Sequence, residues 1–270
     1  MVEAFGVVGL GRMAQALLLP WLEAGLIERS AVRAVVASTT SAERLSRQLQ
    51  LPVAADGAEA WRAPVVLLAV KPQQVELVAA AAPAALAVPG GGESPLLISV
   101  LAGVSLARLQ RLFPGHRCVR AVPNTPCLVR AGLTGLAWGE SIGPERREWV
   151  GCLFAQVGEV LELPEVQLDA FLALTSSGPA FVALVAEAMA DGAVAAGLPR
   201  QLAGHLAHRT LAGTAALLHQ QELHPGQLKD MVTSPAGTTM AGLRQLERAG
   251  LRSALIEAVL AAAQRSRELA

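Results

Sequence analysis

The sequence predicts an α/β domain followed by an all-α domain, and three observations support this fold class. Short apolar runs alternate with helical segments through the first part of the chain, the strand pattern ends near residue 165, and only helical segments follow it. The 270 residues are also more than a single domain usually needs. We therefore predict two domains, 1–163 and 164–270.

The first domain contains five segments with the composition of buried strands. They are continuous apolar runs without polar alternation, which indicates strands buried on both faces of a parallel sheet. These runs are residues 4–11, 32–38, 64–70, 95–101 and 118–123. The segments between them, 12–25, 41–50, 73–82 and 106–113, have helical composition. The pattern is that of repeated βαβ units with helices on both faces of the sheet.

The second domain is predicted to hold helices over 180–197, 199–220, 237–249 and 251–268, separated by Gly and Pro. The first of these is apolar on most faces, but Glu187 and Asp191 argue against a membrane span. Such a helix must be covered by other helices, from the same chain or from a partner chain, which favours an oligomer.

Charge and cysteine content exclude several classes of partner. The formal net charge is zero and no cluster of Lys or Arg is present, so neither a nucleic acid nor an anionic membrane is expected. Cys118, Cys127 and Cys152 are too few and too scattered for a disulfide framework or a metal cluster, and we predict no metal site. The N-terminus lacks the basic segment of a signal peptide, so a cytoplasmic protein is expected.

A glycine motif follows the first predicted strand. In "GLGRMA", Gly9, Gly11 and Ala14 have the G-x-G-x-x-A spacing at the point where a strand passes into a helix. The glycines permit close backbone approach, and the helix N-terminus offers N–H groups to a pyrophosphate. The alternative interpretation is a glycine-rich turn with a structural role only.

The second predicted strand carries no acidic residue at its end that could bind a ribose hydroxyl. Hydroxyl side chains occupy 38–41 instead, and Arg44 follows. Hydroxyls and a guanidinium accept a 2'-phosphate, which favours NADP(H) over NAD(H). The alternative is that Thr40 or Ser41 caps the next helix and Arg44 lies on a solvated face.

Two further loops follow strands at the edge where ligands of open α/β sheets bind. Lys71 ends the strand 64–70, where it could face a cofactor or simply solvent. In "AVPNTPCL", two prolines bracket Asn124 and Thr125, which suits a rigid loop that lines a site or an ordinary turn.

Hydroxyl side chains also cluster before two predicted helices, in "LTSSGPAF" and "HPGQLKDMVTSPAGTT". Each segment combines free backbone N–H groups at a helix N-terminus with hydroxyls. Brought together, residues 175–179 and 234–239 would hold a carboxylate without a cation. The alternative is two ordinary capped helices.

These stretches, together with "AVKP", "LAGVSLARL", "EAMADGAV" and "LRSALIEAV", resemble the pyrroline-5-carboxylate reductase family in order along nearly the whole chain. The resemblance implies an N-terminal NAD(P)-binding Rossmann domain and a C-terminal helical domain that interlocks with a second subunit. It implies the reduction of 1-pyrroline-5-carboxylate to L-proline with NADPH, or with NADH. It also implies a dimer or an assembly of dimers.

The resemblance assigns cofactor contacts to four groups of residues. It places the adenosine side at Ser38 and at Asp56, a position where relatives carry an amide and where a carboxylate would tolerate a 2'-phosphate poorly. The remaining contacts are the pyrophosphate turn at Val8, Gly9, Leu10, Gly11, Arg12 and Met13, the nicotinamide half at Ala69, Val70, Lys71 and Pro72, and the floor beside it at Val100, Leu101 and Ala102.

For the substrate carboxylate, the resemblance implies Ser234, Gly237, Thr238 and Thr239, facing Ser177 and Gly178 of the other segment. In the family these two segments come from different subunits. We expect the Thr239 hydroxyl to act in catalysis by hydrogen bonding to the ring nitrogen of the imine.

Three residues depart from the family pattern. Ser176 replaces a glycine, Phe181 replaces a tyrosine and Ala236 replaces a glycine. If residue 236 needs a positive φ, alanine would be strained there by about 1 kcal/mol.

Two other functions fit the layout. A 3-hydroxyacid dehydrogenase or related imine reductase would share it, but hydroxyacid enzymes use a lysine on the first long helix of the second domain, and 180–197 has none. A non-catalytic dinucleotide-binding protein could keep "GLGRMA" yet lose the hydroxyl loops, whereas this sequence has both.

Overall fold

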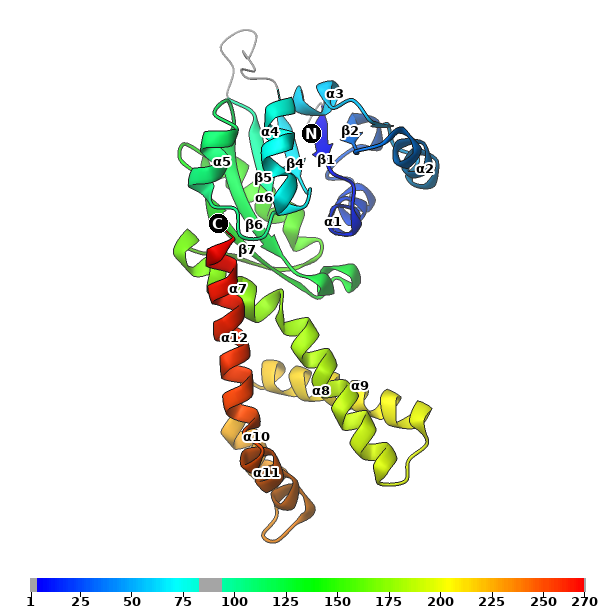
Figure 1. Ribbon diagram of the computed structural model, residues 1–270, viewed down its shortest axis with the longest axis vertical. Helices are drawn as coiled ribbons and strands as arrows, with labels where there is room; N and C mark the ends of the chain where they lie inside the picture. The colour runs from blue at the N-terminus through cyan, green and yellow to red at the C-terminus, as the bar shows by residue number, and fades with distance from the viewer. Residues whose placement is uncertain (1–3, 83–93, 270) are drawn as a thin grey trace. The chain divides into compact units, whose positions relative to one another are not determined.

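The computed structural model describes residues 4–82 and 94–269. The chain separates into two compact units. The first runs to Ser176 and includes the C-terminal residues from Ala262 onward, and the second is Ser177–Ala261. Each unit is described by itself below (Figure 1).

The first unit is built on one eight-stranded sheet with the order β3-β2-β1-β4-β5-β6-β7-β8. The strands are β1 (Phe5–Val8), β2 (Val32–Val35), β3 (Val53–Ala54), β4 (Val65–Leu68), β5 (Leu96–Ser99), β6 (Arg117–Pro123), β7 (Gly132–Trp138) and β8 (Gly158–Glu162).

Strands β1 to β6 are parallel, as predicted. The sequence pattern did not predict β7 and β8: β7 runs antiparallel to β6, while β8 is parallel to β7. The connection from β6 to β7 is the short 3-10 helix η3 (Thr125–Val129), too short for the crossover that a parallel pair requires.

Helices cover both faces of this sheet (Figure 1). One apolar core lies under α1 (Arg12–Glu23), α2 (Thr39–Leu49) and α6 (Pro144–Ala155), with Trp21 and Phe154 edge to face in it. The other lies under α3 (Ala58–Trp61), α4 (Val75–Ala81), α5 (Leu106–Leu112) and α7 (Leu168–Thr175). Three 3-10 helices complete the unit: η1 (Arg29–Ala31), η2 (Pro72–Gln74) and η4 (Glu165–Gln167).

One histidine is enclosed in the second core. His116 is buried against the rings of Trp61 and Phe113. Burial disfavours the charged imidazolium, so the pKa of His116 falls from 6.5 to about 4. The side chain is therefore neutral at physiological pH.

The second unit is helical. It contains α8 (Gly178–Ala195), α9 (Arg200–Gln220), α10 (Pro225–Met231), α11 (Thr238–Arg248) and most of α12 (Leu251–Glu268), whose last residues belong to the first unit. The pattern predicted all of these except α10, where Pro225 and Gly226 open a helix of seven residues inside the expected loop.

This helical unit encloses almost no core of its own. Its buried residues in the described chain are four alanines of α8 and α9, Ala186, Ala190, Ala203 and Ala207. Large apolar side chains stay exposed, among them Val182 and Leu184 of α8. Isolated helices with exposed apolar faces gain most of their stability from packing, so these faces require another surface.

The run Glu165–Ala195, which contains α7 and α8, is the one helical stretch of the described residues that is long and apolar enough to cross a membrane. That statement rests on length and composition alone. A helix that packs against other helices of a protein passes the same test.

Candidate functional site

The glycine turn is shaped by close backbone contact between β1 and β4. Gly9 has φ of +88°, and a methyl group added to it would lie 2.7 Å from the carbonyl oxygen of Ala69. Only glycine fits both restraints. Val8 and Leu10 on either side are buried in the core, so they offer only backbone atoms to a ligand.

Beyond this turn, the N-terminus of α1 is open. Gly11 is the N-cap residue and provides no side-chain cap, and a methyl group added to it would meet nothing within 4 Å. The first N–H groups of α1 therefore have no side-chain acceptor, and the positive end of the helix dipole faces free space. This arrangement fits a pyrophosphate, with Arg12 exposed beside it.

Met13 anchors the turn to the loop after β6. The Sγ of Cys127 contacts the Sδ of Met13 at 3.8 Å. Burial raises the pKa of the Cys127 thiol, so this cysteine remains a neutral packing group.

The residues expected on the adenosine side both act as local caps. Ser38 is the N-cap of α2, and its Oγ accepts a hydrogen bond from Ser41 N at 3.3 Å. Asp56 Oδ1 accepts one from Ala58 N at 3.1 Å. Both side chains are exposed, and capping still leaves each with oxygen lone pairs for a ligand.

The strand order brings the other expected cofactor residues to the same edge. Because β1, β4 and β5 are neighbours and parallel, their carboxyl ends place 8–13, 69–72 and 100–102 side by side. The backbone continues this pairing beyond the strands, since Ala69 N donates to Val8 O at 2.8 Å and Val100 N donates to Leu68 O at 3.0 Å. Lys71 is exposed in this group, Leu101 is buried and Ala102 is exposed.

The loop after β6 has a structural role that sequence patterns did not reveal. Asn124 is buried, donates from Nδ2 to the carbonyl of Thr175 at 2.9 Å and accepts from Leu133 N at 2.8 Å. Both ends of its amide are therefore used within the first unit, where they fix the last turn of α7.

The first hydroxyl segment is less open than its sequence suggests. Thr175 ends α7 and donates its hydroxyl to the Phe171 carbonyl at 2.8 Å. Ser176 donates to the Pro123 carbonyl at 3.4 Å. The helical path breaks only at 176 and 177, so Ser177, as N-cap of α8, and Gly178 are the residues left to meet a ligand.

The second hydroxyl segment forms a tight turn between α10 and α11. Gly237 N donates to Ser234 O at 3.0 Å, with Pro235 and Ala236 at the two central positions. Ala236 has φ of +56°, the left-handed conformation that the third position of such a turn requires. Residue 236 therefore has the positive φ at which an alanine is expected to be strained.

This turn presents hydroxyls at the N-terminus of α11. Gly237 is its N-cap without a side-chain cap, and a side chain at 237 would collide with Ser234 Oγ. The hydroxyls of Ser234, Thr238 and Thr239 make no hydrogen bond to any described residue. Free N–H groups, a helix dipole and three hydroxyls together suit a carboxylate.

The two hydroxyl segments do not assemble within one chain through direct bonds. Within the residues that the structure describes, no hydrogen bond joins 175–179 to 234–239. No group of three or more His, Cys, Asp or Glu side chains suited to a metal occurs among the described residues either.

Comparison with known proteins relates both parts of the chain to one family. Residues 165–269 match the family model for pyrroline-5-carboxylate reductase dimerisation, and residues 4–103 match that for NADP oxidoreductase, coenzyme F420-dependent. A curated pyrroline-5-carboxylate reductase from Synechocystis is 45% identical over 267 residues, which cover 98% of this chain and 97% of that protein.

Two solved structures have the same fold over their whole length. Pyrroline carboxylate reductase from Plasmodium falciparum, with NADP bound, superposes with a TM-score of 0.86 at 27% identity and covers 100% of this chain and 99% of its own. A pyrroline-5-carboxylate reductase from Coxiella burnetii has a TM-score of 0.85 at 30% identity, with the same coverage.

Proposed function

Because the chain belongs to the pyrroline-5-carboxylate reductase family and reduces 1-pyrroline-5-carboxylate to L-proline with NADPH or NADH, we propose how its own residues carry out that reaction. The observation that carries the proposal is the pair of uncapped helix N-termini. One follows Gly11 at the sheet edge, and the other follows Gly237 beside three unpaired hydroxyls. The first would suit the pyrophosphate of the cofactor, and the second would suit the carboxylate of the substrate.

We propose that the cofactor lies along the carboxyl edge of the sheet. The N-terminus of α1 would hold the pyrophosphate, Ser38 and Asp56 would meet the adenosine side, 69–72 would meet the nicotinamide half and 100–102 would lie beneath it. When bound, the reduced nicotinamide supplies a hydride. The chain itself supplies backbone N–H groups and a shaped apolar edge, with Leu101 buried behind it.

The substrate carboxylate would bind at the N-terminus of α11. Ser234 Oγ, the backbone of Gly237, the N–H and hydroxyl groups of Thr238 and the backbone N–H of Thr239 would donate to it. Ser177 and Gly178 would approach from a second copy of the chain, which is consistent with the lack of bonds between the two segments within one chain. A dimer would then be required for a complete site.

Thr239 would hydrogen bond to the ring nitrogen of the imine. A threonine hydroxyl is a weak acid, so it would orient a substrate that arrives protonated, or relay a proton from water to an imine that arrives neutral. Most of the acceleration would come from holding the two reactants in place, an effect for which effective molarities support roughly 7 kcal/mol or more.

The homo-oligomer is built through the helical domain. We propose a cytoplasmic enzyme with no nucleic-acid or membrane partner, since the net charge is zero and the apolar faces of α8 and α9 suit a partner subunit. We also place the functional boundary between the domains at 163 and 164. Ser176 and Phe181 leave the proposed donors in place, because neither side chain is among them.

The test is a spectrophotometric assay of the purified protein. With 1-pyrroline-5-carboxylate, NADPH absorbance should fall in step with proline formation, whereas short hydroxyacids with NADP⁺ should give no signal. Turnover of a hydroxyacid instead would assign the protein to a dehydrogenase. Tight NADPH binding with no turnover of either substrate would indicate a non-catalytic dinucleotide-binding protein.

A further inference from the structure

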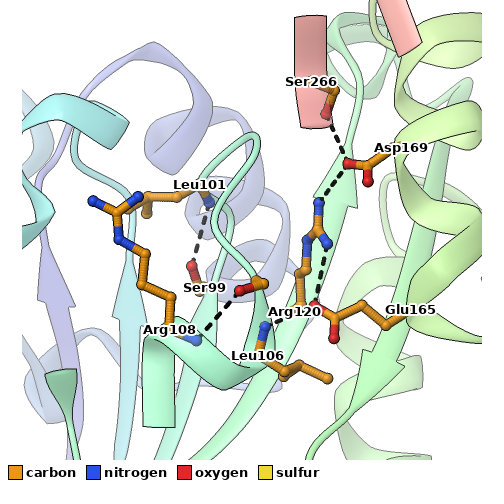
Figure 2. A network of polar contacts seen from close by, with 9 residues as sticks. Ser99, Leu101, Leu106, Arg108, Arg120, Glu165, Asp169 and Ser266 are labelled. Atoms are coloured by element: carbon orange, nitrogen blue, oxygen red, sulfur yellow. Dashed lines mark hydrogen bonds and ion pairs between the residues drawn. The ribbon is translucent and has the colours of Figure 1, made fainter. Parts of the chain in front are cut away.

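A buried arginine lies at the centre of a polar network in the first unit (Figure 2). Arg120 projects from β6 with a side chain that is 3% exposed, and it pairs with Glu165 and Asp169 at 3.1 Å each. An arginine in this position must be paired, since a buried charge without a partner is strongly destabilising. The two carboxylates provide that pairing from η4 and α7.

The network reaches the C-terminal turn of the chain. Ser266, near the end of α12, is buried and donates its hydroxyl to Asp169 Oδ1 at 2.8 Å. One carboxylate thus binds Arg120 and Ser266 together, and Figure 2 shows the three side chains in line. The hydrogen bond joins the last turn of α12 to α7, between residues that are 97 positions apart in the sequence, and through Asp169 to Arg120 of the sheet.

The same network holds the loop that follows β5. Glu165 Oε1, which pairs with Arg120, also accepts from Leu106 N at 2.6 Å, at the end of this loop. In the middle of the loop, Gly103 has φ of +71°, and a methyl group there would lie 2.9 Å from Leu269 Cβ and 3.2 Å from the Ser266 carbonyl. The C-terminal turn therefore packs directly against residue 103.

This loop contains 100–102, the residues proposed to lie beneath the nicotinamide. Its start is pinned by Val100 N, which donates to Leu68 O at 3.0 Å, and by Leu101 N, which donates to Ser99 Oγ at 3.4 Å. Its end is held by the hydrogen bond from Leu106 N to Glu165, and Gly103 in its middle packs against the C-terminal turn. No side chain of that turn is among those proposed to bind either reactant.

We propose that residues 266–269 are a positioning element for the nicotinamide-side loop, held in place by the Arg120–Asp169–Ser266 contacts. The inference rests on the proposed cofactor site. It assigns to Ser266 a role in cofactor affinity that acts through Gly103 and the loop, without contact with the reactants. Small displacements of a binding loop weaken the fit of the ligand even where every contact residue is unchanged.

The test compares Ser266→Ala with two matched variants. Ser266→Thr keeps the hydroxyl, and Ser253→Ala makes the same change at an exposed position of α12. NADPH affinity is measured by fluorescence titration, kcat and the KM for 1-pyrroline-5-carboxylate are measured at saturating NADPH, and dimer content is measured by sedimentation, all at low temperature on folded protein.

We expect Ser266→Ala to weaken NADPH binding by roughly tenfold while kcat at saturation and the KM for the imine stay within about twofold. Ser266→Thr should restore the affinity, and Ser253→Ala should match the wild type. Gly103→Ala, whose methyl group would push the loop away from Leu269 and the Ser266 carbonyl while every side chain of the network is kept, should weaken NADPH binding in the same way.

Unchanged NADPH affinity in folded Ser266→Ala and in Gly103→Ala would overturn the inference and leave the network a purely structural role. If Ser266→Ala does not fold, the result with Gly103→Ala decides. Failure of the proposed function has a different outcome, because it would already be seen in the wild-type protein, as a lack of NADPH binding or a lack of imine reduction.

Discussion

Gly9 and Ala69 approach so closely that a methyl group on Gly9 would lie 2.7 Å from the Ala69 carbonyl oxygen. Their contact joins the turn that is proposed to hold the pyrophosphate to the loop that is proposed to hold the nicotinamide half. The glycine turn is therefore sensitive to substitution at two positions. A side chain at Gly9 would change the spacing between β1 and β4, and a side chain at Gly11 would block access to the N-terminus of α1.

Gly9→Ala should lower both thermal stability and NADPH affinity, because the methyl group forces β1 and β4 apart and the positive φ is strained. Gly11→Ala should keep the melting temperature and still weaken NADPH binding by about tenfold, since its methyl group fills only the space before α1. Gly151→Ala, at an open position inside α6, should leave NADPH affinity unchanged and should raise the melting temperature slightly, because alanine is the better helix former. Normal NADPH titration of Gly11→Ala would remove the α1 N-terminus from the cofactor site.

Thr239→Ala should lower kcat by about a hundredfold and leave NADPH affinity intact, because the hydroxyl that orients the imine nitrogen is lost. Thr239→Ser retains that hydroxyl and should keep most of the activity. Steady-state kinetics and NADPH titration of the three proteins provide the comparison. Full turnover by Thr239→Ala would exclude Thr239 from the catalytic role.

Ala236→Gly should stabilise the protein by up to about 1 kcal/mol, because glycine adopts the φ of +56° without steric strain. Ala241→Gly, inside α11, should have the opposite effect, with a loss of about 1 kcal/mol. Urea unfolding at a fixed protein concentration measures both. A loss of stability in Ala236→Gly would mean that the left-handed conformation of residue 236 is not strained.

His116 should make the protein sensitive to acid. Its pKa in the folded state is about 4, below the 6.5 of an exposed histidine, so protonation favours the unfolded chain. The contribution of neutral His116 to the free energy of unfolding is complete above pH 6.5 and is lost as the pH falls toward 4. By pH 5 the free energy of unfolding has fallen by about 2 kcal/mol. His116→Gln should therefore lose less stability than the wild type between pH 7.5 and pH 5 in urea titrations. Equal losses of stability in the wild type and in His116→Gln would contradict the lowered pKa of His116.

Leu184→Glu should dissociate the oligomer, because this residue of α8 is 66% exposed in one chain and belongs to the apolar face that a partner would cover. Sedimentation velocity should show a monomer, and activity should fall because the site needs both copies. Leu77→Glu, an equally exposed leucine on α4 of the first unit, should remain an oligomer. An intact dimer in Leu184→Glu would exclude this face of α8 from the interface.

The sequence predicts the strands that are buried on both faces and misses those at the end of the sheet. β4 is apolar at every position, β5 is apolar except at Ser99, and both strands are fully buried. β8 carries Glu159 and Glu162 on a half-exposed edge, so neither a continuous apolar run nor a clean alternation marks it. β7 is interrupted by glycines, and it became antiparallel because η3 is short.

The candidate site likewise has a part that the sequence predicts and a part that it does not. The cofactor edge can be predicted, since the glycine motif and the order of parallel strands together fix where 8–13, 69–72 and 100–102 meet. The hydrogen bond of Ser176, the amide bonds of Asn124 and the partners of Arg120 could not be predicted. They involve tertiary neighbours up to 53 residues away, for which a single sequence holds no local pattern.

The carboxylate shared by Arg120 and Ser266 also has a consequence for biosynthesis of the chain. During translation, the nucleotide-binding sheet is synthesised long before the residues that complete its polar centre, because α12 follows every strand of the sheet along the chain. Until Ser266 emerges, Asp169 lacks one of its two hydrogen-bond donors and the loop at Gly103 has no turn to pack against. The polar centre of the nascent sheet is therefore completed only after α12 has been synthesised.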